Sequence, residues 1–322
     1  MFNRKFRLEL SGTDAPIKSI EELRMDFQYK QHLYMDDKSN MADTFVLEVY
    51  NLSVESFKAM TTNKQLDIRF YAGYEDGDKL DLVFEGVVTN VTGMRRIPEH
   101  ITTLWCIPKG LSKAIKTVSV TTGRGDTVKT MLEKIATSLS LKPTFIGLKD
   151  RVDIPYRGIT VEGSGIKRIV DIGKQFYFMP RCEGDELRLI TLPEEGSIDE
   201  ITKERKPIVL KADRMRGTPT VSVSKINIPY AFNTDIHTGD IIDTSKLEGS
   251  KNNTITGGIG NPNGLVNLTG VGIGSLHYSD TLYKWAIETK YIIMGATHIG
   301  SNYTDKYVSN YECAVYTFNS KG

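Results

Sequence analysis

The side chains best suited to metal binding or nucleophilic catalysis are few and widely separated in this sequence. Its five histidines and three cysteines include no two with the spacing that metal ligands have on one helix or hairpin. No serine stands in the G-x-S-x-G pattern of a nucleophile elbow. The pattern therefore predicts neither a metal site nor a catalytic nucleophile among these residues: His32, His100, His237, His277, His298, Cys106, Cys182 and Cys313.

Other motifs that could indicate a binding or catalytic site lack the flanking structure that such a site needs. The glycine-rich runs at 257–260 and 270–274 do not stand between a strand and a helix, as dinucleotide and phosphate loops do. Arg124-Gly125-Asp126 spells a cell-attachment tripeptide, but a turn into a helix cap explains it better. Paired carboxylates at 36–37 and 194–195 lie in polar turns. We expect no catalytic, cofactor-binding or metal-binding residue, no cofactor, and a protein that is not an enzyme.

Composition places the chain among globular proteins of balanced charge. Its 322 residues suffice for about two domains of roughly 150 residues each. The 41 Lys and Arg balance 40 Asp and Glu, which argues against a nucleic-acid binder with a large basic surface. No apolar run approaches the roughly 18 residues of a membrane span, and residues 1–12 lack the apolar core of a secretory signal. We expect a protein made in the cytoplasm, with no membrane span and no specific nucleic-acid site.

Residues 1–110 alternate between apolar and polar side chains, the pattern of half-buried strands. Turn residues separate these strands, and only residues 53–63 suit a short helix. So many strands with one apolar face predict a tube-like β-barrel or sandwich domain. The strands are expected at residues 6–10, 23–35, 45–49, 68–72, 82–88 and 102–107.

Residues 111–205 have the sequence pattern of a small α+β domain. Two amphipathic helices and a hairpin can be placed in it, and a polar linker follows. The helices are expected from Asp126 or Thr127 to Leu139, stopped by Pro143, and from Ser164 onward; the hairpin turns around 183–185, and the linker is 193–206.

Residues 206–322 return to strands and predict a second tube-like β domain, with a flexible Gly/Asn-rich loop at about 248–279. Its two closing strands, at 285–297 and 307–318, repeat an earlier hairpin. Gly86 precedes Cys106 by 20 residues, and Gly295 precedes Cys313 by 18. This spacing predicts a duplicated β domain on either side of the α+β domain.

Several short motifs, in order, resemble the baseplate hub proteins of contractile-tailed bacteriophages, the late-control protein D-like family related to tail tubes. Residues 45–53 read FVLEVYNLS, 68–74 read IRFYAGY and 83–88 read VFEGVV, as in the N-terminal domain of that family. The helices and hairpin of 127–190 resemble its middle region, and 217–221, 236–240 and 291–298 resemble its second barrel. The resemblance covers most of the chain; the loop at 248–279 departs from it.

The resemblance implies a structural protein of the virion, in the baseplate of the phage tail. Two tube-like domains per chain would give a homotrimer six similar modules, matching a six-fold tail tube on one side and a three-fold spike on the other. The implied partners are the tail tube protein and the central spike protein, with tape measure and baseplate wedge proteins as further candidates. Edge strands of such a ring should pair across subunits, and we expect these at Phe84, Gly86, Val88, Ile293, Gly295 and Thr297.

Two alternatives remain open. A tail tube protein shares the barrel lineage, but usually needs one barrel and no α+β region. A hub-associated cell-wall hydrolase or glycan-binding module needs an acid pair in a cleft or an aromatic platform. Neither Trp105 nor Trp285 stands in an aromatic cluster of that kind.

Overall fold

The computed structural model describes residues 3–12, 19–33, 43–74, 79–147, 151–155, 157–191, 205–217, 219–221, 225–247 and 290–314. The expected loop at 248–279 and Trp285 lie outside these residues. The chain divides into two compact units. Unit 1 contains Met1–Leu192 and Ile299–Lys306, and unit 2 contains Pro193–His298 and Tyr307–Gly322. The expected border at 110 lies inside unit 1, so the division into three domains stays a prediction.

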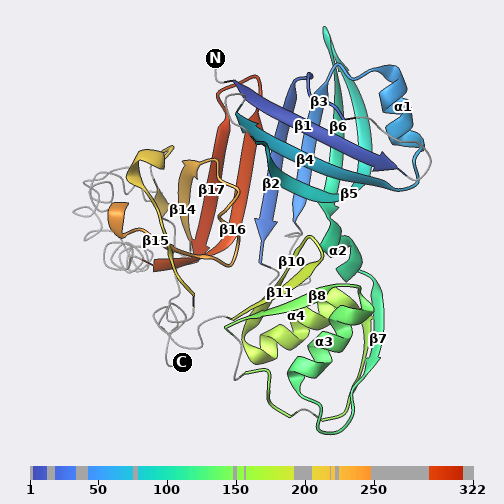
Figure 1. Ribbon diagram of the computed structural model, residues 1–322, viewed down its shortest axis with the longest axis vertical. Coiled ribbons are helices and arrows are strands. Elements are labelled where there is room, and N and C mark those ends of the chain that lie inside the picture. Colours follow the sequence, from blue (N-terminus) through green and yellow to red (C-terminus); the bar gives the residue numbers. More distant parts are fainter. Residues whose placement is uncertain are drawn as a thin grey trace, which may run out of the picture. The chain divides into compact units, whose positions relative to one another are not determined.

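The alternating residues at the start of unit 1 form antiparallel strands in the order β1-β4-β5-β6-β3-β2 (Figure 1). The expected short helix is α1, Val54–Thr62, which begins where Ser53 Oγ accepts a hydrogen bond from the Ser56 amide. The strands are β1 Arg4–Gly12, β2 Met25–His32, β3 Thr44–Tyr50, β4 Leu66–Tyr74, β5 Asp81–Arg96 and β6 Glu99–Pro108.

The sheet folds back around a core of aromatic rings. Phe6 of β1 and Phe27 of β2 come from strands far apart in the sheet order, yet their ring centroids are 5.5 Å apart. Phe45 and Phe70 complete the cluster, with centroids 5.4 Å apart. In the described residues β1 and β2 do not pair. The fold is mainly β, as expected, and the described strands of this region form no closed barrel.

The middle of unit 1 contains the expected mixture of helices and strands. Thr127 caps the first long helix, and its Oγ1 accepts from the Thr130 amide. That helix ends at Ser138, ahead of the expected stop at Pro143: Ser140 takes a left-handed φ of 55°, and Pro143 lies in the strand that follows. The elements are α2 Lys109–Ala114, β7 Thr117–Thr121, α3 Val128–Ser138, β8 Lys142–Ile146, β9 Thr160–Ser164, α4 Gly165–Phe176, β10 Phe178–Glu183 and β11 Glu186–Thr191.

These middle elements have a core of their own. α3 and α4 bury apolar faces whose members include Leu132, Ile135 and Ile169, all fully buried. The sheet β10-β11-β8 supplies Leu187 and Leu189 to the same core (Figure 1). Burial of this many aliphatic side chains is the main stabilising contribution to such a small region.

Unit 2 is built mainly from strands around a second apolar core. β14 pairs antiparallel with β17, and β15 with β16. Tyr291 and Tyr311 are the largest fully buried side chains in that core. The bounds are β12 Ile208–Val209, η1 Ala212–Arg214, β13 Thr220–Val221, β14 Lys225–Ala231, β15 Ile241–Asp243, η2 Ser245–Leu247, β16 Lys290–Ser301 and β17 Tyr307–Ala314.

Candidate assembly interface

Gly86, expected at an edge, lies inside the sheet, whereas Phe84 pairs with Phe70 of β4 and lies beyond the end of the ladder with β6. Gly86 pairs with Ile68 of β4 on one side and with Pro108 of β6 on the other. Phe84 is 2% exposed, and its ring stacks on Phe45 with centroids 4.3 Å apart. Alternation in the sequence identified the strand correctly, but it carries no information on which strands flank it.

Val88 has a different environment from Gly86. It pairs with Cys106 of β6, but the ladder between β4 and β5 ends one residue earlier, at Asp67 and Val87. A bulge follows between Val88 and Asn90. On the β4 side of β5, the open edge therefore begins only at Val88 and continues toward the end of the strand.

The three residues expected at an edge in β16 belong to unit 2. Ile293 is fully buried; its amide donates to the Asp240 carbonyl at 3.0 Å, and its carbonyl accepts from the Gly239 amide at 2.7 Å. The backbone of Ile293 is thus bonded within its own chain and is no open edge. Gly295 is buried and Thr297 is half-buried. A role of those two in subunit pairing stays a prediction.

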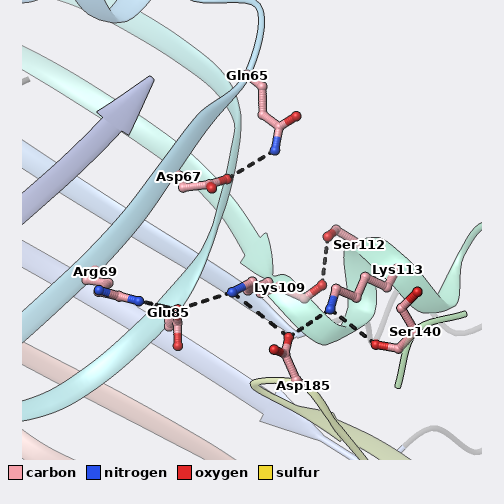
Figure 2. Close-up of polar contacts among 9 residues, drawn as sticks. All are labelled: Gln65, Asp67, Arg69, Glu85, Lys109, Ser112, Lys113, Ser140 and Asp185. Carbon is pink, nitrogen blue, oxygen red and sulfur yellow. Dashed lines mark hydrogen bonds and ion pairs between the residues drawn. The ribbon is translucent and has the colours of Figure 1, made fainter. Parts of the chain in front are cut away.

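Charged side chains connect the β sheet of unit 1 to its α+β part, and Figure 2 shows them. Lys109, the first residue of α2, places Nζ 3.6 Å from Glu85 Oε1 and 4.0 Å from Asp185 Oδ1. Lys113 Nζ is 2.9 Å from the same Asp185 oxygen, and Arg69 is 3.1 Å from Glu85. Charges of alternating sign therefore run from β4 and β5 through α2 to the turn between β10 and β11.

Close backbone approach accompanies these ion pairs. A Cβ on Gly110 would lie only 2.5 Å from the carbonyl oxygen of Gly184, in the turn between β10 and β11. α2 therefore needs glycine at this point to approach the turn. The ion pairs orient α2, and the glycine sets its distance from the turn.

Asp185 provides a pH-dependent test of this junction. The hydrogen bond from Lys113 lowers the pKa of the Asp185 carboxyl, so the ion pair stabilises the folded chain above the unfolded pKa and is lost as pH falls through the folded one. Because the Asp185 side chain is 60% exposed, Asp185→Asn should lower the free energy of unfolding by less than about 1 kcal/mol at neutral pH. Urea unfolding across a pH series should show this difference vanish in acid. A difference that persists in acid would contradict it; Asp153→Asn, an exposed residue outside the junction, is the control.

A small hollow of about 280 Å³ lies beside this junction. Its charged lining is largely paired, since Glu9 is 3.2 Å from Arg7 and Glu85 is 3.1 Å from Arg69. The lining residues are Glu9, Leu10, Ser11, Asp67, Ile68, Arg69, Glu85, Gly86 and Lys109.

The nucleophile candidates from the sequence lie in core positions. Cys106, Cys182 and Cys313 are all buried, and burial raises the pKa of each thiol well above its usual value. His298 and Ser309 are also buried; Ser309 Oγ lies 2.8 Å from His298 Nδ1 and accepts from the Asn233 amide at 3.1 Å. This enclosed pair is a satisfied structural contact. Sequence spacing did not reveal it, because the two residues meet across a hairpin.

Within the described residues, no group of three or more His, Cys, Asp or Glu could hold a metal ion. No helix in that part of the chain is long and apolar enough to cross a membrane.

Within unit 1, the guanidinium of Arg4 binds a distant turn, a contact that the sequence did not indicate. Arg4 of β1 donates to the backbone carbonyls of Ser301, Thr304, Asp305 and Lys306 at 2.7–3.2 Å. One cation thus satisfies four carbonyl oxygens of a turn almost 300 residues away. Such a contact has no local sequence pattern.

Asn302 holds the same turn from another direction. Its Oδ1 accepts from the Met25 amide at 2.8 Å, and its Nδ2 donates to the Leu23 carbonyl at 2.9 Å. The turn at 299–306 therefore contacts both β1 and the start of β2. These bonds explain why Ile299–Lys306 belongs to unit 1.

Removal of the Arg4 guanidinium should measurably lower the free energy of unfolding. Arg4→Met keeps most of the side-chain volume but removes the guanidinium donor from all four carbonyls, of which that of Lys306 keeps the Ser301 amide at 2.9 Å. The variant should lower the free energy of unfolding by about 1–2 kcal/mol. Arg7→Met, on the same strand, removes a partly exposed ion pair with Glu9 and should cost less than about 1 kcal/mol. Denaturant titration measures both. Equal losses would contradict a special role for Arg4.

The likeness of this chain to known proteins is one of fold. No protein-family model matches the chain, and no curated protein matches it. A solved tail protein of Neisseria meningitidis superimposes with a TM-score of 0.53 at 8% identity, covering 96% of each chain. The 43 kDa tail protein of prophage MuSo2 from Shewanella oneidensis gives 0.54 at 8% identity, covering 97% of this chain and 96% of its own. The chain therefore shares its fold with phage tail proteins over nearly its whole length.

Proposed function

We propose that this chain is the structural baseplate hub protein of a phage tail. The observation that carries the proposal is the end-to-end likeness of fold to two tail proteins. The order of motifs in the sequence, which resembles the hub family, supports it independently. In this role the chain acts through its interfaces, in the virion tail, after synthesis in the host cytoplasm.

The proposed hub is a homotrimer that adapts the six-fold tail tube to the three-fold central spike. Two mainly β units with separate cores in one chain support this arrangement, since three chains then supply six such units. The proposed partners are the tail tube protein and the central spike protein, with tape measure and baseplate wedge proteins in contact at the periphery. Buried thiols and paired carboxylates support a role without catalysis.

Nucleation of the tail tube is the function to test. Purified chain, added in small amounts to the purified tail tube protein of the same phage, should shorten the lag of tube growth and cap one end of each tube, as seen by electron microscopy. Tubes that grow equally well without the chain would contradict nucleation. Filaments made of this chain alone would favour a tail tube protein instead, and clearing of cell wall in a zymogram would favour a hydrolase.

A further inference from the structure

Four large hydrophobic side chains of the described residues differ from the rest by their exposure. They are at least 60% exposed, whereas the others are at most 51% exposed. The four are Val54, Met94, Ile97 and Tyr303, and all belong to unit 1. Exposed apolar side chains that gather in one place mark a contact site, whereas single ones are ordinary. These four lie on three segments, and the contacts of those segments bring them to one end of the sheet.

Met94 and Ile97 lie at the free end of the hairpin formed by β5 and β6. The ladder between β3 and β6 ends at Ile101, whereas β5 and β6 stay paired up to Arg96 and Glu99. The ladder of β5 with β4 has ended before this point. Among the described strands, the hairpin end therefore has no neighbour on either side, and Figure 1 shows it projecting from the sheet beside α1.

The start of α1 is bonded to the same hairpin end. The Asn51 amide donates to the His100 carbonyl at 2.7 Å, and Asn51 Oδ1 accepts from the His100 amide at 3.0 Å. Val54 begins α1 three residues after Asn51. A Cβ on Gly93 of β5 would lie 3.1 Å from the ring of Phe57, so α1 also packs against this hairpin. Val54 is thus held beside the hairpin end.

The turn at 299–306 reaches the hairpin end through a stack of side chains. Glu99 Oε1 lies 3.6 Å from Arg24 Nη1. The guanidinium carbon of Arg24 lies 4.0 Å from the centre of the Tyr50 ring and 4.9 Å from that of the Tyr303 ring. Arg24 therefore holds Tyr303 near the hairpin by a favourable cation–π contact. The four exposed side chains thus surround one end of unit 1, the apolar end: Val54, Met94, Ile97 and Tyr303.

Two arginines accompany these apolar side chains. Arg95 and Arg96 are exposed, and in the described chain no ion pair joins either of them to a carboxylate. Glu99, opposite Arg96 in the hairpin, is paired with Arg24 instead. Exposed Glu55, in the first turn of α1, pairs with neither arginine. Two guanidinium groups are therefore available to carboxylates of another molecule, which arginine binds through two parallel hydrogen bonds.

The composition of the apolar end fits a protein partner of complementary charge. Tyr, Met and Arg are among the residue types enriched in protein–protein interfaces. A two-fold contact between copies of this chain would bring Arg95 and Arg96 of one copy against those of the other, and like charges across an interface are unfavourable. A different protein, with carboxylates at the border of an apolar surface, meets the same arginines favourably. The charge of the apolar end therefore favours such a partner over a second copy.

We propose that the apolar end of unit 1 is a docking surface for another tail protein, one that presents an apolar surface bordered by carboxylates. This inference rests on the proposed structural role in the phage tail and names the residues and the chemistry of one contact. Ile97 and Met94 are buried against the apolar surface of that protein, and Arg95 and Arg96 bind its carboxylates.

Two variants with matched controls separate docking from folding. Ile97→Ser removes the most exposed apolar side chain of the hairpin, and Ile115→Ser removes another exposed isoleucine, at the end of α2. Arg96→Glu reverses one charge of the apolar end, and Arg124→Glu does the same to an exposed arginine in the α+β part. Because all four side chains are exposed, urea unfolding of each variant should match that of the wild type.

The probes are the purified tail tube protein and the purified central spike protein of the same phage, each titrated against the wild-type chain and the variants. For at least one of them, Ile97→Ser and Arg96→Glu should each raise the Kd by about tenfold or more. Ile115→Ser and Arg124→Glu should bind as the wild type does. Added salt should weaken binding of the wild type more than that of Arg96→Glu, which has lost an attractive charge.

The outcomes distinguish this docking surface from the hub role itself. An equal Kd for the wild type and all four variants would overturn the docking surface and leave the hub intact. A loss of assembly mass in Ile97→Ser, seen by light scattering, would overturn it in favour of a second copy. Binding to phosphatidylglycerol vesicles that Arg96→Glu abolishes, without effect on protein binding, would overturn it in favour of a membrane. A wild-type chain that binds neither tube nor spike protein would overturn both proposals.

Discussion

Replacement of Phe84 by alanine is expected to lower the free energy of unfolding by about 3–5 kcal/mol, the range for a truncated core phenylalanine. The ring is 2% exposed and stacks on Phe45 at an interplanar angle of 6°. It also meets Tyr29 edge-on, with centroids 5.1 Å apart. Alanine would leave a cavity among rigid aromatic rings that cannot collapse into it. Urea unfolding followed by circular dichroism measures the loss.

Phe84→Leu is the matched control for this cavity. Leucine refills most of the space, so its cost should be well below that of alanine. An interface residue would behave differently: alanine would then reduce the mass of the assembly in solution and leave the unfolding of the single chain unchanged. That result would restore Phe84 to the subunit edge and contradict its place in the core.

Gly86→Ala is expected to have the second largest effect, lowering the free energy of unfolding by about 2–4 kcal/mol. The added methyl group overpacks this point and displaces the backbone. A Cβ at Gly86 would lie 2.2 Å from the Ile107 carbonyl oxygen and 2.5 Å from the Phe84 ring. The carbonyl belongs to β6, so it cannot rotate away as a side chain does. Thermal and urea unfolding should both register the loss.

Gly93→Ala, in the same strand, is the control for loss of a glycine at a less closely packed position. A Cβ there meets only the ring of Phe57, at 3.1 Å, and that side chain can shift. Gly93→Ala should change the free energy of unfolding by no more than about 1 kcal/mol, since alanine is also less costly than glycine in the middle of a strand. Similar losses for Gly86→Ala and Gly93→Ala would contradict the assignment of Gly86 to a closely packed ladder.

Local features of this fold could be predicted from the sequence because their causes are local. The helix after Thr127 has its cap and its apolar spacing within a dozen residues, and α3 follows them. The hairpin of β10 and β11 turns at Gly184, where a positive φ of 54° suits glycine. The resemblance to tail proteins rested on the order of short motifs, and the shared fold is consistent with it.

Contacts between distant segments could not be predicted in this way. Alternation placed Phe84 on a strand, but only the register shows Gly86 with partners on both sides. The bonds from Arg4 to the turn at 301–306 join residues with no shared pattern. The open edge at 88–96 appears only when the end of the β4 ladder is known. Pairing partners are set by packing of the whole unit, so a single strand does not reveal them.

The mass of the purified wild-type chain in solution tests the central claim most directly. A ring of three chains predicts about 108 kDa by light scattering after size exclusion, against 36.1 kDa for one chain. If the chain runs as a monomer alone, the measurement is repeated with the spike protein present, where the trimer should form. A monomer under both conditions, or open filaments of growing mass, would contradict the account of this chain as a trimeric hub.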